Sequence, residues 1–141
     1  MTITKVGPQQ LLPVHIEYLT KVVNNMISES LTNLTGFNHL LMYPNLIFVM
    51  AFEGKVPVGV LACSVQQQTT TCHVLVAYVS KDHQKKGVFK GMLQEIKKSD
   101  VIPQFKWNKI TFGVMTGNKS MQKVMRLSGA SPEATIYSIS L

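Results

Sequence analysis

The segment VSKDHQKKGVFKG, residues 79–91, places a β-like run directly before a lysine-rich turn with two glycines and the start of a helical pattern. The first N–H groups of a helix have no partners inside the helix and carry the positive end of its dipole. A strand–turn–helix junction is therefore a prepared anion site. Gly87 allows the backbone to wrap a phosphate, and Lys85, Lys86 and Lys90 add positive charge. The alternative interpretation is a solvated basic loop before an ordinary helix.

The pattern upstream of this junction predicts strands and helices in a fixed order. Residues 2–6 alternate like a short strand, and apolar residues then recur at helical spacing as far as Met26, although Pro13 leaves the start of that helix open. A second helix is expected at about residues 30–41. Three β-type runs with turn-rich connections follow, at residues 46–52, 58–66 and 72–79.

The pattern downstream of the junction completes the predicted fold. The first helix after the turn should bury one face, made of Val88, Met92, Leu93 and Ile96. A strand at residues 108–115, a helix capped by Asn118 that stops at Gly129, and a closing strand at residues 134–140 follow. The predicted order is β-α-α-β-β-β-α-β-α-β, a single mixed α/β domain over residues 1–141.

The charge of the chain limits the classes of partner. Fourteen lysines and arginines face seven acidic residues, which gives a net charge of +7 and favours phosphates or anionic surfaces. Only Arg126 among these cations is arginine, so bidentate arginine readout of guanine is excluded as a main mechanism. A nucleic-acid binder that contacts phosphates through its lysines is a third hypothesis. The sequence argues against it because the lysines are not interleaved with aromatic residues, as they are in single-strand stacking platforms.

The N-terminal sequence and the cysteine spacing both indicate an intracellular protein. Residues 1–10 contain no apolar signal-peptide core, and the apolar run at residues 46–52 is too short to span a bilayer, so we expect no membrane contact and a cytoplasmic location. The cysteines and histidines lack ligand spacing, and the sequence predicts no metal site. If a hairpin is centred near Gln67 and Gln68, Cys63 and Cys72 face each other across it as reduced thiols.

Two short motifs give the chain a family resemblance. The run Gln84-Lys85-Lys86-Gly87-Val88-Phe89 resembles the Q/R-x-x-G-x-G/A pyrophosphate-binding signature of the GNAT superfamily, the acyl-CoA-dependent N-acetyltransferases, with Phe89 in place of the small final residue. Asn118, followed eleven and twelve residues later by Gly129 and Ala130, resembles the later helix that flanks the pantetheine arm, with Ala130 in place of the common phenylalanine.

The resemblance implies a fold and a cofactor site. A GNAT fold has a mixed, mostly antiparallel sheet flanked by helices, in which the strand at residues 72–79 splays from the strand at residues 108–115 and admits the pantetheine of acetyl-CoA. A main-chain amide near Val79 would polarise the thioester carbonyl. The cofactor-binding residues carried over to this sequence are Val79, Gln84, Lys85, Lys86, Gly87, Val88, Phe89, Lys90 and Asn118.

The resemblance also defines what catalysis requires. Counted back from Gln84, His73 falls where histone-acetylating relatives carry a general-base glutamate, and a histidine suits removal of an ammonium proton through water. Met125 occupies the position of the usual acid tyrosine and cannot donate a proton. Tyr137 is our candidate acid by chemistry, with Tyr78 and Ser120 as alternatives, and direct release of the thiolate is a further route.

The sequence therefore predicts a small N-acetyltransferase that transfers acetyl from acetyl-CoA to an unidentified amine. The positive charge disfavours polycations and favours a protein amine, or an amine on an otherwise anionic molecule. The alternative, motivated by Phe89, Met125 and Ala130, is a GNAT-fold binding or assembly module that has lost transfer, including a virus-encoded one.

Overall fold

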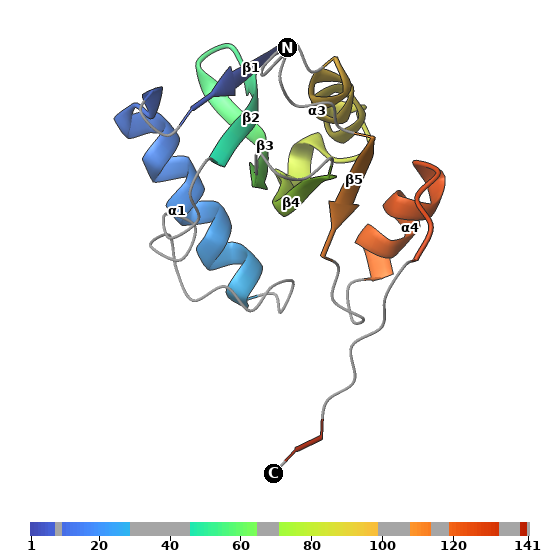
Figure 1. The fold of residues 1–141 in the computed structure, drawn as a ribbon. Coiled ribbons are helices and arrows are strands. Elements are labelled where there is room, and N and C mark those ends of the chain that lie inside the picture. Colours follow the sequence, from blue (N-terminus) through green and yellow to red (C-terminus); the bar gives the residue numbers. More distant parts are fainter. Residues whose placement is uncertain are drawn as a thin grey trace.

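The computed structural model describes residues 1–7, 10–28, 46–64, 71–98, 108–113, 119–132 and 139–140. Its elements in chain order (Figure 1) are β1 (Thr2–Val6), α1 (Pro13–Ser28), β2 (Leu46–Glu53), β3 (Val56–Ser64), β4 (Thr71–Val79), a 3-10 helix (Lys81–His83), α3 (Val88–Lys97), β5 (Lys109–Phe112) and α4 (Lys119–Leu127). This order agrees with the predicted mixed α/β fold. The helix predicted at residues 30–41 lies outside the described residues, as does the predicted closing strand up to residue 138.

The five described strands form one sheet in the order β1-β2-β3-β4-β5. The pairs from β1 to β4 are antiparallel, whereas β4 and β5 are parallel. The sheet is therefore mostly antiparallel, as expected. A parallel neighbour requires a crossover connection, and α3 lies within the segment that joins β4 to β5.

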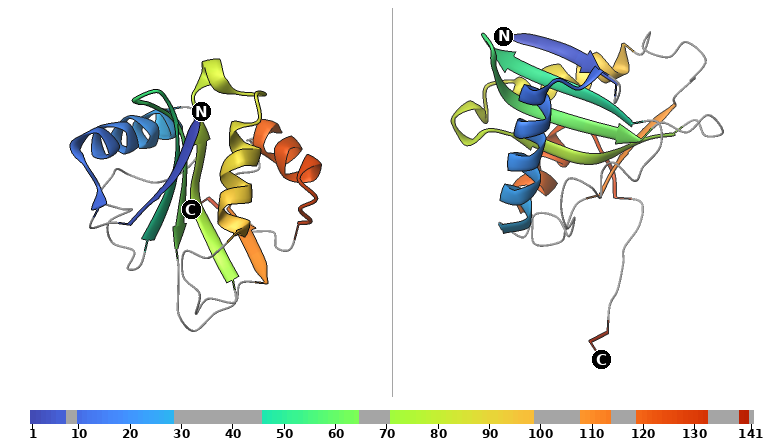
Figure 2. Two further views of the ribbon diagram at one scale, coloured as in Figure 1. Left: turned by 90° about the horizontal axis from the view of Figure 1, so that it is seen from above. Right: turned by 90° about the vertical axis from the view of Figure 1, so that its left-hand side faces the viewer.

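Helices cover both faces of the sheet, with α1 on one face and α3 and α4 on the other (Figure 2). The core on the α1 side contains Phe48, Met50 and Val60, and the core on the α3 side contains Val49, Leu61 and Met92. Strands β2 and β3 are buried on both faces, which is why their sequences are nearly continuous apolar runs. All four residues of the predicted apolar face of α3 are buried: Val88, Met92, Leu93 and Ile96.

The start of α1 explains the position of Pro13. Pro13 is the first residue of the helix, where a missing N–H costs nothing and the fixed φ of proline is favourable. The buried His15 accepts a hydrogen bond from the N–H of Leu12 through Nδ1 at 3.0 Å, which satisfies one of the donors at the helix start. Helix α1 has 16 residues, and within the described ranges no helix is long and apolar enough to cross a membrane.

The predicted register between the two cysteines is wrong. Cys63 pairs with Val74 rather than with Cys72, so the two thiols are diagonal neighbours on one face of the sheet. Both are free and buried. A hydrogen bond with Cys72 and burial raise the pKa of Cys63 well above its ordinary value, which keeps this thiol protonated.

Candidate functional site

The junction between β4 and α3 has the geometry of an anion site. Gly87 is the N-cap of α3 and adopts a left-handed conformation with φ of 80°, a region that favours glycine. Within the described part of the chain, the backbone N–H groups of residues 85–90 donate to no carbonyl, and the N–H of Gly91 is the first to bond back, to the carbonyl of Gly87 at 2.9 Å. These amides are therefore available to a ligand at the positive end of the helix dipole.

The bulky Phe89 leaves this turn open. Its ring packs against Phe112 of β5, with ring centroids 6.1 Å apart, and it contributes to the core beneath α3. A Cβ built on Gly87 would meet no described heavy atom within 4 Å. The large side chain of Phe89 thus fits here because it turns toward the sheet. Lys85, Lys86 and Lys90 stay exposed around the turn.

The side chain of Gln84 ties the turn back to the end of β4. Its Nε2 donates to the carbonyl of Val79 at 3.0 Å. The N–H of Ser80 donates to the carbonyl of Val58 on β3 at 2.8 Å. Because peptide groups of successive strand residues point to opposite sides, those of Val79 point away from β3. The N–H of Val79 therefore lies on the outer edge of β4, beside the turn.

That outer edge of β4 is unpaired over its second half among the described residues. Strand β5 pairs with β4 only from Thr71 to Val74. A β-bulge begins at the same place, because Val74 pairs with Cys63 and Val76 with Ala62, which leaves Leu75 without a partner on β3. Bulges bend a strand and increase its twist. The residues after Gly113 lie outside the described part of the chain, so the expected separation of the two strands stays a prediction.

His73 lies on the other face of the sheet from the α3 core. Its neighbours Cys72 and Val74 point into that core, so the intervening side chain of His73 points to the α1 side and is exposed. Its Nδ1 is 2.7 Å from Oγ1 of Thr111, the residue beside it on β5. This contact joins the ring to β5 within the paired part of the two strands.

The sequence matches the model of the Acetyltransferase (GNAT) family over residues 17–129. This match agrees with the observed fold and with the geometry of the junction between β4 and α3. This chain belongs to the GNAT family. No curated protein sequence matches this GNAT chain significantly.

Solved structures share this GNAT fold over nearly the whole chain. An aminoglycoside acetyltransferase from an uncultured soil metagenomic sample, in complex with sisomicin, has 13% identity and a TM-score of 0.72 over 99% of this chain and 95% of its own. Aminoglycoside N-acetyltransferase AAC(6')-Iy in complex with CoA has 14% identity and a TM-score of 0.69, covering 99% of each chain. Ribosomal-protein-alanine N-acetyltransferase from Brucella melitensis biovar Abortus 2308 has 14% identity and a TM-score of 0.72, covering 100% of each chain. At identities this low, the structural likeness shows that the fold is shared and nothing beyond the fold.

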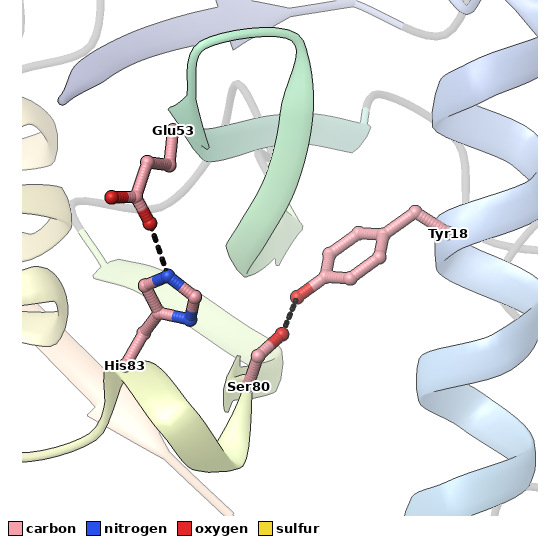
Figure 3. Close-up of polar contacts among 4 residues, drawn as sticks. All are labelled: Tyr18, Glu53, Ser80 and His83. Atoms are coloured by element: carbon pink, nitrogen blue, oxygen red, sulfur yellow. Dashed lines mark hydrogen bonds and ion pairs between the residues drawn. The ribbon is translucent and has the colours of Figure 1, made fainter.

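Two polar contacts between residues distant in the sequence lie near this junction of the GNAT chain. The hydroxyl of Tyr18 on α1 is 3.2 Å from Oγ of Ser80, directly after β4 (Figure 3). Burial, opposed by the hydrogen bond to Ser80 and reinforced by nearby Tyr78, raises the pKa of Tyr18 to about 12, so the hydroxyl stays protonated at neutral pH. His83 contacts the carboxylate of Glu53 through Nε2 (Figure 3). Neither pair has a local sequence signal, because 62 and 30 residues separate the partners.

Several predicted site residues are not brought together by the described structure. Asn118 and Tyr137 lie outside the described residues. Met125 lies half-buried on α4 and has no proton to donate. The helix that carries it ends as predicted, because Gly129 has a φ of 83° and the N–H of Ala130 bonds back to the carbonyl of Met125 at 3.0 Å.

Proposed function

We propose that this GNAT chain is an N-acetyltransferase that uses acetyl-CoA to acetylate an amine. The observation that carries the proposal is the set of amides at residues 85–90, which donate to no carbonyl of the described residues and lie beside the end of β4. The amides, the left-handed Gly87 and the exposed lysines fit a diphosphate in sign and in space. A structural neighbour crystallised with CoA supports an acyl-CoA ligand.

The residues of the turn would bind the cofactor in two parts. The amides around Gly87, with Lys85, Lys86 and Lys90, would hold the diphosphate. The open edge of β4 would take the pantetheine, with the N–H of Val79 as a hydrogen-bond donor. Gln84 keeps the carbonyl of Val79 occupied, so the free group presented at this point is a donor. A donor is the group needed to stabilise a developing oxyanion.

The proposed chemistry follows from these positions. Acetyl-CoA supplies a thioester whose carbonyl carbon is the electrophile. His73 lies six residues before Val79 on β4, roughly 20 Å along the strand, so it would take the proton of the acceptor ammonium through a chain of waters and leave a neutral nitrogen to attack that carbon. The N–H of Val79 stabilises the negative oxygen until the C–S bond breaks. The sulfur leaves as a thiolate and takes a proton from solvent or from Tyr137, while the second amine proton goes to His73 or water.

A protein amine is the acceptor that the charge of this chain favours. Two of the three structural neighbours described for this chain are aminoglycoside acetyltransferases, and aminoglycosides are polycations. A third neighbour acetylates the alanine of a ribosomal protein. A domain with a net charge of +7 repels free polycations, so we infer an α-amine or lysine on a protein, or an amine on an otherwise anionic molecule.

Thermal unfolding with and without acetyl-CoA tests the proposal, because a ligand bound only by the native state raises its stability. We expect a rise in Tm with acetyl-CoA, followed by turnover on an acidic peptide with a free α-amine in preference to sisomicin. No rise in Tm would remove the proposal.

A catalytically impaired binding module is the second candidate, because α4 carries Met125 where the relatives have an acid. It predicts the rise in Tm with acetyl-CoA but no turnover on any amine. The two candidates therefore share the first measurement and separate at the second.

A further inference from the structure

The connection between β4 and the phosphate-binding turn is held by side chains at both of its ends. At its start, Ser80 contacts Tyr18 of α1, and at its end Gln84 bonds back to Val79. Between them, His83 reaches across to Glu53, the last residue of β2 (Figure 3). The 3-10 helix Lys81–His83 has no buried residue of its own, so these side-chain contacts fix where the turn begins.

The Glu53–His83 contact joins the middle of this connection to the end of β2. His83 precedes Gly87 by four residues, and Glu53 begins the tight turn between β2 and β3. The side chain of His83 is 23% exposed and that of Glu53 is 66% exposed. The Nδ1 atom of His83 is buried and has no partner among the described residues. Nε2 is therefore the nitrogen that carries the proton and donates it toward the carboxylate.

The position of Glu53 sets two physical effects against each other. The hydrogen bond and charge interaction with His83, and more weakly the positive charges of Lys86 and the N-terminal amine, lower the pKa of Glu53, so its carboxylate is negative at neutral pH. A negative charge near the phosphate-binding turn should repel the diphosphate of CoA. The same charge, through its hydrogen bond to His83, should hold the turn in the conformation that presents its amides. On charge alone Glu53 weakens CoA binding, whereas through positioning it strengthens binding.

We propose that Glu53 and His83 act as a pair of positioning residues for the CoA-binding turn and that positioning outweighs the repulsion. The inference rests on the proposed function, since it names two residues that support the same site. Neither residue contacts the cofactor in this proposal. Their role is to lower the cost of ordering residues 84–90 when the diphosphate binds.

Calorimetric titration of the full chain with CoA tests whether Glu53 strengthens or weakens CoA binding. We expect Glu53→Gln to bind CoA about two- to fivefold more weakly than the wild type, the size of effect measured for exposed ion pairs. His83→Leu should lose a similar factor, and the double variant Glu53→Gln/His83→Leu should be no weaker than either single variant, because the two residues act as one unit. His83→Gln keeps an N–H donor for Glu53 and should bind CoA more tightly than His83→Leu.

A matched control removes the same charge elsewhere. Glu17→Gln changes an exposed carboxylate on α1, and its affinity for CoA should match that of the wild type. Equal or tighter CoA binding by Glu53→Gln, additive losses in the double variant, or equal affinities of His83→Gln and His83→Leu would each overturn the positioning role. Absence of CoA binding by the wild type would instead overturn the proposed function. Circular dichroism and Tm of each free variant establish that it folds.

Discussion

Replacing Gly59 with alanine should displace α3 from the sheet and weaken CoA binding. Gly59 lies on β3 opposite Val79, directly under the first turns of α3. A Cβ at this position would lie 3.0 Å from Cγ1 of Val88, 3.0 Å from Cε of Met92 and 3.3 Å from Sδ of Met92. The end of Met92 can move, but Val88 is β-branched and buried at the helix start. The added methyl group must therefore shift the first turn of α3 by a few tenths of an ångström.

The expected cost is that of an overpacked core, about 1–3 kcal/mol of unfolding free energy. For a domain of this size that corresponds to a fall in Tm of roughly 3–12 °C. Affinity for CoA should fall as well, because the shifted turn carries the amides of residues 85–90. The assays are thermal unfolding of the free protein and calorimetric titration with CoA.

Two variants separate overpacking from a general effect of losing a glycine. Gly113→Ala should leave Tm unchanged, because a Cβ there meets nothing within 4 Å in the described structure. In a Val88→Ala background the Gly59→Ala change should cost less, because the Cγ1 atom that it meets has been removed. An unchanged Tm for Gly59→Ala, or the same loss in both backgrounds, would refute the packing of α3 on Gly59.

The remaining predictions concern single residues of the site. His73→Gln should lower kcat by about 10²- to 10⁴-fold in steady-state assays and leave the Kd for CoA from calorimetry unchanged; an unchanged kcat would exclude His73 as the base. Gly87→Ala should cost about 1–2 kcal/mol, measured by urea unfolding, from backbone strain at a φ of 80°, since the space around it is open. Tyr18 ionises near pH 10 when unfolded but at a pKa of about 12 when folded, so stability should fall as pH rises through that interval. In Tyr18→Phe the loss of unfolding free energy at high pH should be smaller, by at most about 2.7 kcal/mol. The same loss with pH in the wild type and in Tyr18→Phe would contradict the burial of Tyr18.

Local chemistry explains which features the sequence could predict. The helix face of α3 follows from the spacing of Val88, Met92, Leu93 and Ile96, and all four are buried. The turn before α3 is predicted from Gly87, because glycine is favoured where the backbone is left-handed, and Gly87 has that conformation. In each case the signal and the structure lie within one turn of the same helix.

Features that depend on distant partners could not be predicted in this way. Residues 74–79 are apolar or aromatic at every position, so no break in an alternating pattern marks the bulge at Leu75. The bulge moves the partner of Cys63 from Leu75 to Val74, which is still two residues from Cys72, so the expected pairing was wrong because the assumed centre of the hairpin at Gln67 and Gln68 was wrong. The Glu53–His83 contact likewise depends on how β2 and β4 are placed in the sheet.

The described site also bears on whether transfer needs an acid. Met125 cannot donate a proton, and Tyr18, whose pKa is about 12, holds its proton too tightly to give it fully to a thiolate. A thiol ionises with a pKa of about 8.5, so CoA can leave as a thiolate near neutral pH and be protonated by solvent afterwards. The harder requirement is a neutral amine, since an alkyl ammonium ionises near pH 10.4. In the proposed mechanism, the base His73 and the oxyanion donor at Val79 are therefore the groups that acetyl transfer requires, and methionine in place of the acid is compatible with that mechanism.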